Sequence, residues 1–326
     1  MKTIAVDLMG GDHAPEAIVD GIKSALKKYE DIQILAFGTV GSWTETHDRV
    51  KFVEVTEVIT SEDDPVRAVR RKKDSSIVRA AKAVKEGEAD AFVSAGNTGA
   101  LLTAGLFVIG RIKGIERPAL ASMIPTTNNK GMLLLDLGAN SENKPKHLLQ
   151  FAHMASIYME NIRGRKNPSI GLINNGSEDI KGTPLTKETH QLLQDSNLNY
   201  SGYFETRDIL TGKYDIGVTD GFTGNIVLKT IEGTASSLLG EVKKIFLSSM
   251  LNKLSALVVK KDLGQLKDLM DYRQFGGAPL LGLNGHVLKA HGSSDALAIE
   301  NAIRNAITMA NSDAIEQIKE AIFEDE

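Results

Sequence analysis

The feature that most constrains the fold of this chain is a repeated alternation of short apolar runs with longer amphipathic stretches. Nearly continuous apolar runs are typical of strands that are buried on both faces of a parallel sheet. The amphipathic stretches between them have the pattern of helices that cover such a sheet. We therefore expect an α/β fold with strands at 4–6, 32–37, 91–94, 132–137, 170–173 and 216–219. The expected helices are 15–29, 76–85, 98–109, 144–163 and 187–194, with two surface helices in 295–323.

Composition limits the classes of protein that fit. The chain has 326 residues, 42% of them hydrophobic, and neither a Pro/Ser-rich linker nor an internal repeat, so we expect one α/β unit over 1–326. The net charge of −4 provides no overall basic field for nucleic acid. The absence of cysteine excludes disulfides, thiolate metal sites and a cysteine nucleophile. No signal-peptide pattern opens the chain and no apolar run reaches about 18 residues, which favours a cytoplasmic protein.

Glycine turns follow most of the expected strands. The set is "VDLMGGDHAP", "VSAGNTGALLTAG", "LDLGANSENK", "LINNGSEDIKGTP", "VTDGFTGNIVLKT" and "LKAHGSSDA". In an open α/β sheet such turns lie at the carboxyl ends of the strands, where ligands bind. We expect Asn97–Thr98, Thr223 and Ser293–Ser294 to cap the helices that follow. Because helix N-termini attract anions, the turns together predict a crevice for phosphate or carboxylate.

Several common sites are not supported by the sequence. It contains no dinucleotide fingerprint, no P-loop, no serine-hydrolase elbow and no H-E-x-x-H zinc motif. His147 and His153 share an expected helix, but at a spacing of six residues they point to different faces and do not form a metal site. His13 and His291 both lie in glycine turns, where a catalytic role and a loop-bonding role are equally open.

The motifs together identify a family. "VDLMGGDHAPEAIVDG", "SAGNTGALL", "LDLGAN", "TDGFTGNIVLKTIEG" and "FGGAPLLGLNGHVLKAHGSSD" resemble the bacterial phosphate acyltransferase of phospholipid synthesis, the PlsX family, from about residue 3 to 310. The resemblance implies a three-layer α/β/α fold like that of isopropylmalate dehydrogenases and phosphotransacetylases. It also implies a homodimer that uses no metal or nucleotide cofactor. The chain departs from the family pattern at "KGTP", 181–184, where Asn is expected after the glycine.

The resemblance implies a reaction. Such enzymes move a long-chain acyl group from acyl carrier protein to inorganic phosphate, and a membrane acyltransferase passes the acyl phosphate to glycerol 3-phosphate. Alternatives are a short-chain phosphotransacetylase that uses acyl-coenzyme A, a dehydrogenase of the isopropylmalate type, and a non-catalytic anion-binding module. In the implied reaction phosphate is the nucleophile and a thiol of pKa about 8.5 leaves. The protein's tasks are then positioning and stabilisation of charge.

Site residues are assigned from the positions of the turns under this resemblance. Asn225 and Asn97 are the expected oxyanion donors, and Asp220 with His291 is an expected acid/base or orienting pair. Asp7 and Asp12 are expected to brace the first turn and His13. Lys181 is expected to assist phosphate, and the remaining phosphate-binding set is Gly10, Gly11, Thr98, Gly99, Thr223, Gly224 and Lys229.

Two basic stretches predict interaction surfaces. "RAVRRKK", 67–73, has five basic residues in seven. It is either an ordinary solvated helix face or, through Arg67, Arg70, Arg71, Lys72 and Lys73, a docking patch for the acidic carrier protein. The stretch 242–261 has five lysines, no acid and apolar residues at helical spacing. Its first part also fits a core or dimer-interface helix. A protruding amphipathic segment at about 236–272 would contact the inner face of the cell membrane through Met250, Leu251, Leu254, Leu257 and Val258.

Overall fold

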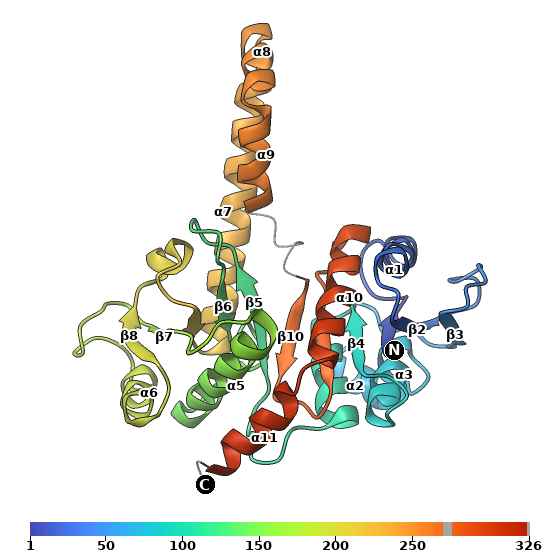
Figure 1. Cartoon of the computed structure of the whole chain (residues 1–326), viewed down its shortest axis with the longest axis horizontal. Coiled ribbons are helices and arrows are strands. Elements are labelled where there is room, and N and C mark those ends of the chain that lie inside the picture. The colour runs from blue at the N-terminus through green and yellow to red at the C-terminus, as the bar shows by residue number, and fades with distance from the viewer. Residues whose placement is uncertain (270–275, 325–326) are drawn as a thin grey trace.

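The computed structural model describes residues 1–269 and 276–324, and within them one sheet of eleven strands lies between two layers of helices (Figure 1). The strand order is β3-β2-β1-β4-β11-β10-β5-β6-β9-β7-β8. The strands are β1 Lys2–Asp7, β2 Ile32–Gly38, β3 Val50–Glu54, β4 Ala91–Ser94, β5 Ala119–Ile124, β6 Met132–Leu135, β7 Ile170–Ile173, β8 Tyr200–Phe204, β9 Ile216–Val218, β10 Ala278–Leu281 and β11 His286–Lys289. The helices are α1 Glu16–Lys28, α2 Pro65–Arg71, α3 Ser76–Lys85, α4 Thr98–Ala104, α5 Pro145–Arg163, α6 Pro184–Asp195, α7 Gly221–Leu247, α8 Met250–Val258, α9 Lys260–Leu269, α10 Ala296–Ala310 and α11 Ala314–Glu324.

The two faces of the sheet carry separate cores, which confirms the three-layer α/β/α prediction. On one face, α1, α5, α10 and α11 pack around a cluster that includes Ile22, Phe151 and Ile303. On the other, α2, α3, α4 and the start of α7 cover a second cluster around Phe92 and Leu134. Burial of these apolar side chains is the main source of the fold's stability.

The sheet is mostly parallel, but its two halves run in opposite directions. β10 pairs antiparallel with both β11 and β5, and β5 pairs antiparallel with β6. The half β6-β9-β7-β8 therefore runs opposite to the half β3-β2-β1-β4-β11. The six glycine turns consequently do not share one edge of the sheet, as a uniformly parallel sheet would require. The turns after β1, β4 and β11 lie together, and those after β6, β7 and β9 belong to the other half.

The last helices correct a sequence prediction. The expectation of two surface helices in 295–323 is wrong for α10, most of which is buried against α1 and the sheet. Gly21 on α1 explains how close the two helices come, because an added Cβ would lie 2.5 Å from the Cβ of Ile299. Glu300 of α10 also contacts α1, accepting hydrogen bonds from Ser24 at 2.5 Å and Lys28 at 2.7 Å.

The helix caps also differ in part from expectation. Asn97 caps α4 as predicted, since its Oδ1 accepts a hydrogen bond from Ala100 N at 3.0 Å. The predicted caps Thr223 and Ser293–Ser294 are wrong, because both helices begin at an aspartate. Asp220 accepts from Thr223 N at 2.9 Å, and Asp295 accepts from Ala298 N at 3.0 Å. Asp is as strong an N-cap as Ser, so composition alone does not choose between neighbouring caps.

The segment 181–184 that departs from the family pattern starts α6. Thr183 Oγ1 accepts from Thr186 N at 3.2 Å, and Pro184 is the first helical residue, where its missing N–H costs nothing. Gly182 has φ +98°, which favours glycine, and its Cα approaches the side chain of Asn174. In this chain the departure therefore supplies a helix cap.

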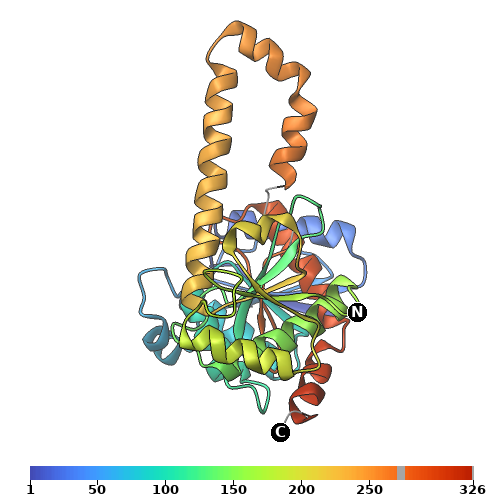
Figure 2. The ribbon, with the colours of Figure 1, turned by 90° about the vertical axis from the view of Figure 1, so that its left-hand side faces the viewer.

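Helices α7, α8 and α9 form a hairpin that projects far from the body (Figure 2). The beginning of α7 packs on β6, the helix then leaves the body, and α8 lies at the far end before α9 returns. The end of the segment expected to protrude, 270–272, lies outside the described residues. Among the described helices, none combines the length and apolar character needed to cross a membrane.

Candidate functional site

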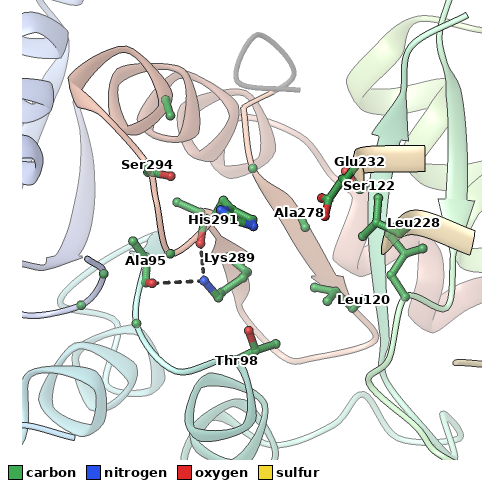
Figure 3. Close-up of a pocket in the computed structure, with 18 of the residues that line it drawn as sticks. Ala95, Thr98, Leu120, Ser122, Leu228, Glu232, Ala278, Lys289, His291 and Ser294 are labelled. Atoms are coloured by element: carbon green, nitrogen blue, oxygen red, sulfur yellow. Dashed lines mark hydrogen bonds between the residues drawn. The ribbon is translucent and has the colours of Figure 1, made fainter. Parts of the chain in front are cut away.

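A cavity of about 990 Å³ lies where the turns after β1, β4 and β11 face the flank of α7 (Figure 3). Its volume is in the upper range for small-molecule sites. The polar side comprises Gly10, Gly11, Asp12, Asn97, Thr98, Gly99, Lys289, His291 and Ser294. The opposite side is mostly apolar, with Leu120, Ile124, Leu137, Leu228, Ile231 and Leu239, and also carries Asn225, Lys229 and Glu232 of α7. The cavity therefore offers a polar end and a long apolar wall.

Glycine lets the first two turns approach closely. A Cβ at Gly10 would lie 2.5 Å from Asp7 Oδ2 and would also collide with the backbone of Gly96. Gly11 has φ +105°, a conformation that other residues rarely adopt. Asp12 N donates to Gly292 O at 2.8 Å, which joins the first turn to the one after β11. The role of glycine predicted from the sequence thus has a direct structural basis.

Asp7 braces these turns from below. Its buried carboxylate accepts from Ser94 Oγ at 2.7 Å and from Met9 N at 2.9 Å. Burial raises the pKa of Asp7, while the hydrogen bonds from serines and the nearby Lys289 oppose that increase. Asp7 does not line the cavity, and its contacts agree with the predicted bracing role.

Lys289 places a cation at the polar end of the cavity. The sequence alone does not predict it as a site residue. Its side chain is buried, and Nζ donates to the carbonyls of Ala95, at 3.1 Å, and Ala290 (Figure 3). Burial lowers the pKa of Lys289 to about 8, against the attraction of Asp7 and Asp12. The available signal was a lysine within the apolar strand "HVLKA", directly before a glycine turn.

The start of α4 supplies amide donors. Thr98 and Gly99 are the first two residues of the helix, where backbone N–H groups have no intrahelical acceptor. Within the described residues, neither amide donates to another protein group, and both residues line the cavity. Asn97 is less free than predicted, since its Oδ1 caps the helix and its Nδ2 donates to Thr60 O at 3.2 Å.

Helix α7 forms the opposite wall. Asn225 lies at its start beside Gly138, where an added Cβ would come within 3.3 Å of the Asn225 Cβ. Its side-chain amide makes no hydrogen bond within the described residues, so it is available to a ligand. Lys229 lines the cavity but pairs with Glu232 at 2.7 Å.

His291 lines the cavity with its ring fixed by the same turn. Its Nδ1 lies 3.2 Å from the donor Ser293 N and 2.8 Å from Ser293 Oγ. Acceptance at Nδ1 places the proton of the neutral ring on Nε2. Burial lowers the pKa of His291, so the neutral form dominates at pH 7.

The structure does not bring every predicted residue to this cavity. Asp220, the expected partner of His291, caps α7 and does not line the cavity. Thr223 N donates to Asp220 Oδ1 and Gly224 N donates to Asp220 O. These two amides are therefore not available to phosphate, contrary to the prediction. Lys181 is exposed on the turn after β7, in the oppositely running half of the sheet, and does not line the cavity.

The basic patch lies on α2, a helix whose first residue contacts the site. Asp64 caps this helix, and Pro65 packs against Gly99 of the site, with 2.7 Å between Pro65 Cγ and a Cβ added at Gly99. Lys72 is held by Asp63 at 2.7 Å and by Val58 O at 2.8 Å. The cations that remain exposed are Arg67, Arg70, Arg71 and Lys73, and Arg70 lies over the ring of Phe107.

Metal ligation finds no support in this site. Within residues 1–269 and 276–324, no three His, Asp or Glu side chains gather closely enough to hold a metal ion.

Solved structures share this architecture. A branched-chain phosphotransacylase from Enterococcus faecalis V583 aligns over 96% of this chain and 100% of its own, with a TM-score of 0.63 and 17% identity. A phosphotransacetylase from Streptococcus pyogenes aligns over 95% of this chain and 94% of its own, with a TM-score of 0.61 and 16% identity. The fold is therefore that of the phosphotransacylases.

Sequence relatives define the family within that class. A family model described as fatty acid synthesis protein matches residues 2–317. A phosphate acyltransferase from Geobacillus sp. (strain WCH70) is 53% identical over 322 residues, 98% of each chain. Another from Staphylococcus haemolyticus (strain JCSC1435) is 49% identical over 323 residues, 99% of this chain and 98% of the relative. The chain belongs to this fatty acid synthesis protein family, the PlsX family that its motifs resemble, and is an acyltransferase.

Proposed function

We propose that the protein transfers a long-chain acyl group from the thioester of acyl carrier protein to inorganic phosphate, releasing acyl phosphate and free carrier protein. The observation that carries this proposal is that anion-binding groups face a long, mostly apolar wall within one cavity. The anion-binding groups suit phosphate, and the apolar wall suits an acyl chain. The names of the family relatives support the same reaction class. Acyl phosphate made in this way would supply glycerol-3-phosphate acylation by a membrane enzyme.

The chemistry requires little from protein side chains beyond positioning. Phosphate held at the amides of Thr98 and Gly99 would attack the thioester carbonyl at a high effective concentration. The free amide of Asn225 is the best-placed oxyanion donor, with Asn97 as the second. His291, neutral and with Nε2 protonated, would donate a hydrogen bond to the departing thiolate and so stabilise its negative charge.

Partner surfaces follow from the same arrangement. The helix that carries the exposed arginines, α2, begins beside Gly99 of the site, so an acidic carrier docked there would lie close to the cavity with its thioester. The tip of the hairpin exposes Met250, Leu251, Leu254, Leu257 and Val258. We propose that this tip touches the anionic inner membrane surface, where the insoluble product is consumed. A homodimer, implied by the resemblance alone, completes the proposal.

The reaction is tested by incubating the purified protein with phosphate and one of three donors: palmitoyl-carrier protein, palmitoyl-coenzyme A or acetyl-coenzyme A. Acyl phosphate is trapped as its hydroxamate. The proposal predicts product with the palmitoyl-carrier protein and little with acetyl-coenzyme A. The reverse preference would favour the short-chain phosphotransacetylase. Absence of product with all three donors would contradict acyl transfer to phosphate.

A further inference from the structure

The turn that follows β11 contains two groups with unused hydrogen-bonding capacity at the polar end of the cavity. The hydroxyl of Ser294 is 4% exposed and has no hydrogen-bond partner within the described residues. Ser294 lines the cavity and lies on the same side as Lys289 in Figure 3. A buried hydroxyl without a partner costs free energy, so its retention at a cavity wall indicates a ligand that completes it.

Lys289 contributes the charge. An ammonium group has three N–H donors, and carbonyls of Ala95 and Ala290 take two of them. Asp7 and Asp12 compensate part of this buried charge through space, but within the described residues no carboxylate accepts a hydrogen bond from Lys289. An anion in the cavity would supply both an acceptor for the third donor and a compensating charge.

We infer that Lys289 and Ser294 bind the inorganic phosphate that attacks the thioester, together with the Thr98 and Gly99 amides. This assignment rests on the proposed function and adds two phosphate ligands to it. It places the nucleophile at the inner, polar end of the cavity and leaves the apolar wall of α7 to the acyl chain. Lys229, which is exposed and paired with Glu232, lies on the opposite wall.

The charges around Lys289 define how phosphate binding depends on pH. Asp7 and Asp12 favour the protonated amine, Lys229 disfavours it, and His291 and Glu232 line the same cavity. With the pKa of Lys289 at about 8, the amine is mostly cationic at pH 7 and loses its proton above pH 8. Phosphate affinity should therefore fall between about pH 7 and 9 in the wild-type protein, roughly one pH unit on either side of that pKa.

The test measures phosphate binding and turnover separately in Ser294→Ala, Lys289→Met and the control Ser201→Ala. Ser201 is an exposed serine of β8 and does not line the cavity. We expect Ser294→Ala to raise the KM for phosphate about 5- to 10-fold and Lys289→Met more than about 10-fold, with the KM for acyl carrier protein unchanged. Ser201→Ala should leave both constants unchanged, and the pH dependence should be absent in Lys289→Met.

Stabilisation of the wild-type protein by inorganic phosphate alone, without acyl donor, tests the subsite independently of the reaction. A phosphate-dependent rise in Tm that Ser294→Ala loses supports the inference even if no acyl phosphate forms, a result that would contradict only the proposed function. If Lys289→Met does not fold, Ser294→Ala and the wild-type pH profile decide. A folded Ser294→Ala with unchanged phosphate affinity overturns the assignment, as does an equal loss of affinity for the acyl donor.

Discussion

The exposed apolar tip of the helical hairpin allows a quantitative prediction for membrane binding. Leu254 is 59% exposed and Leu257 is 68% exposed. Complete burial of a leucine contributes about 1.5–3 kcal/mol, so these two exposed fractions together correspond to about 2–4 kcal/mol on insertion into the interface. Replacing both by Glu should therefore weaken partitioning by roughly 30- to 700-fold. Repulsion between the new carboxylates and anionic lipid adds to that loss.

The assay is co-sedimentation with vesicles of mixed phosphatidylglycerol and phosphatidylcholine, over a series of lipid concentrations. The control is Leu238→Glu, a leucine of α7 that is 63% exposed but lies on the shaft, well before the tip. We expect the control to bind like wild type and to have the same thermal stability. Wild-type binding in the Leu254→Glu, Leu257→Glu double variant, or equal loss in the control, would refute the tip as the contact.

Three further predictions concern docking, catalysis and stability. Arg70→Glu with Arg71→Glu should raise the KM for acyl carrier protein at low salt and reduce its salt dependence, with palmitoyl-coenzyme A kinetics as the control. Asn225→Ala should lower kcat about 100- to 1000-fold at unchanged Tm if its amide is an oxyanion donor, and undiminished turnover would remove that role. Burial lowers the pKa of His286 to about 4, so the unfolded chain takes up a proton below pH 6.5 before the folded protein does. Stability should consequently fall between pH 6.5 and 4, by up to about 3 kcal/mol, and denaturant titrations of His286→Gln should show a shallower fall.

The sequence predicts the fold best where pattern and burial agree. Runs such as 32–37 and 91–94 are buried on both faces and coincide with β2 and β4 within one residue. The sequence does not predict the edge strand β3 because this strand is half exposed, nor β10, which contains a proline. The opposite direction of the second half of the sheet depends on antiparallel pairings at β5 and β10, which no local pattern specifies.

The residues of the candidate site also fall into two groups: those with a local sequence signature and those that depend on tertiary packing. The sequence predicts that Gly10, Gly11, Thr98 and Gly99 lie at the site, and they line the cavity, because backbone approach and helix starts leave a signature in the sequence. The sequence predicts a cap at Ser294 that Asp295 forms instead, and it does not indicate Lys289, because burial of a lysine is a property of tertiary packing.

Because α7 is a single helix, its length fixes the distance between the cavity and any surface that the tip contacts. One uninterrupted helix runs from the cavity wall to the turn before α8. From Leu239, the last α7 residue at the cavity, to Leu247, where α7 ends, a rise of 1.5 Å per residue spans about 12 Å. This rigid spacer would hold the cavity mouth clear of the lipid headgroups by a fixed distance. An acyl phosphate leaving the cavity would then have to cross that gap along the hairpin, so the length of α7 becomes a determinant of product transfer.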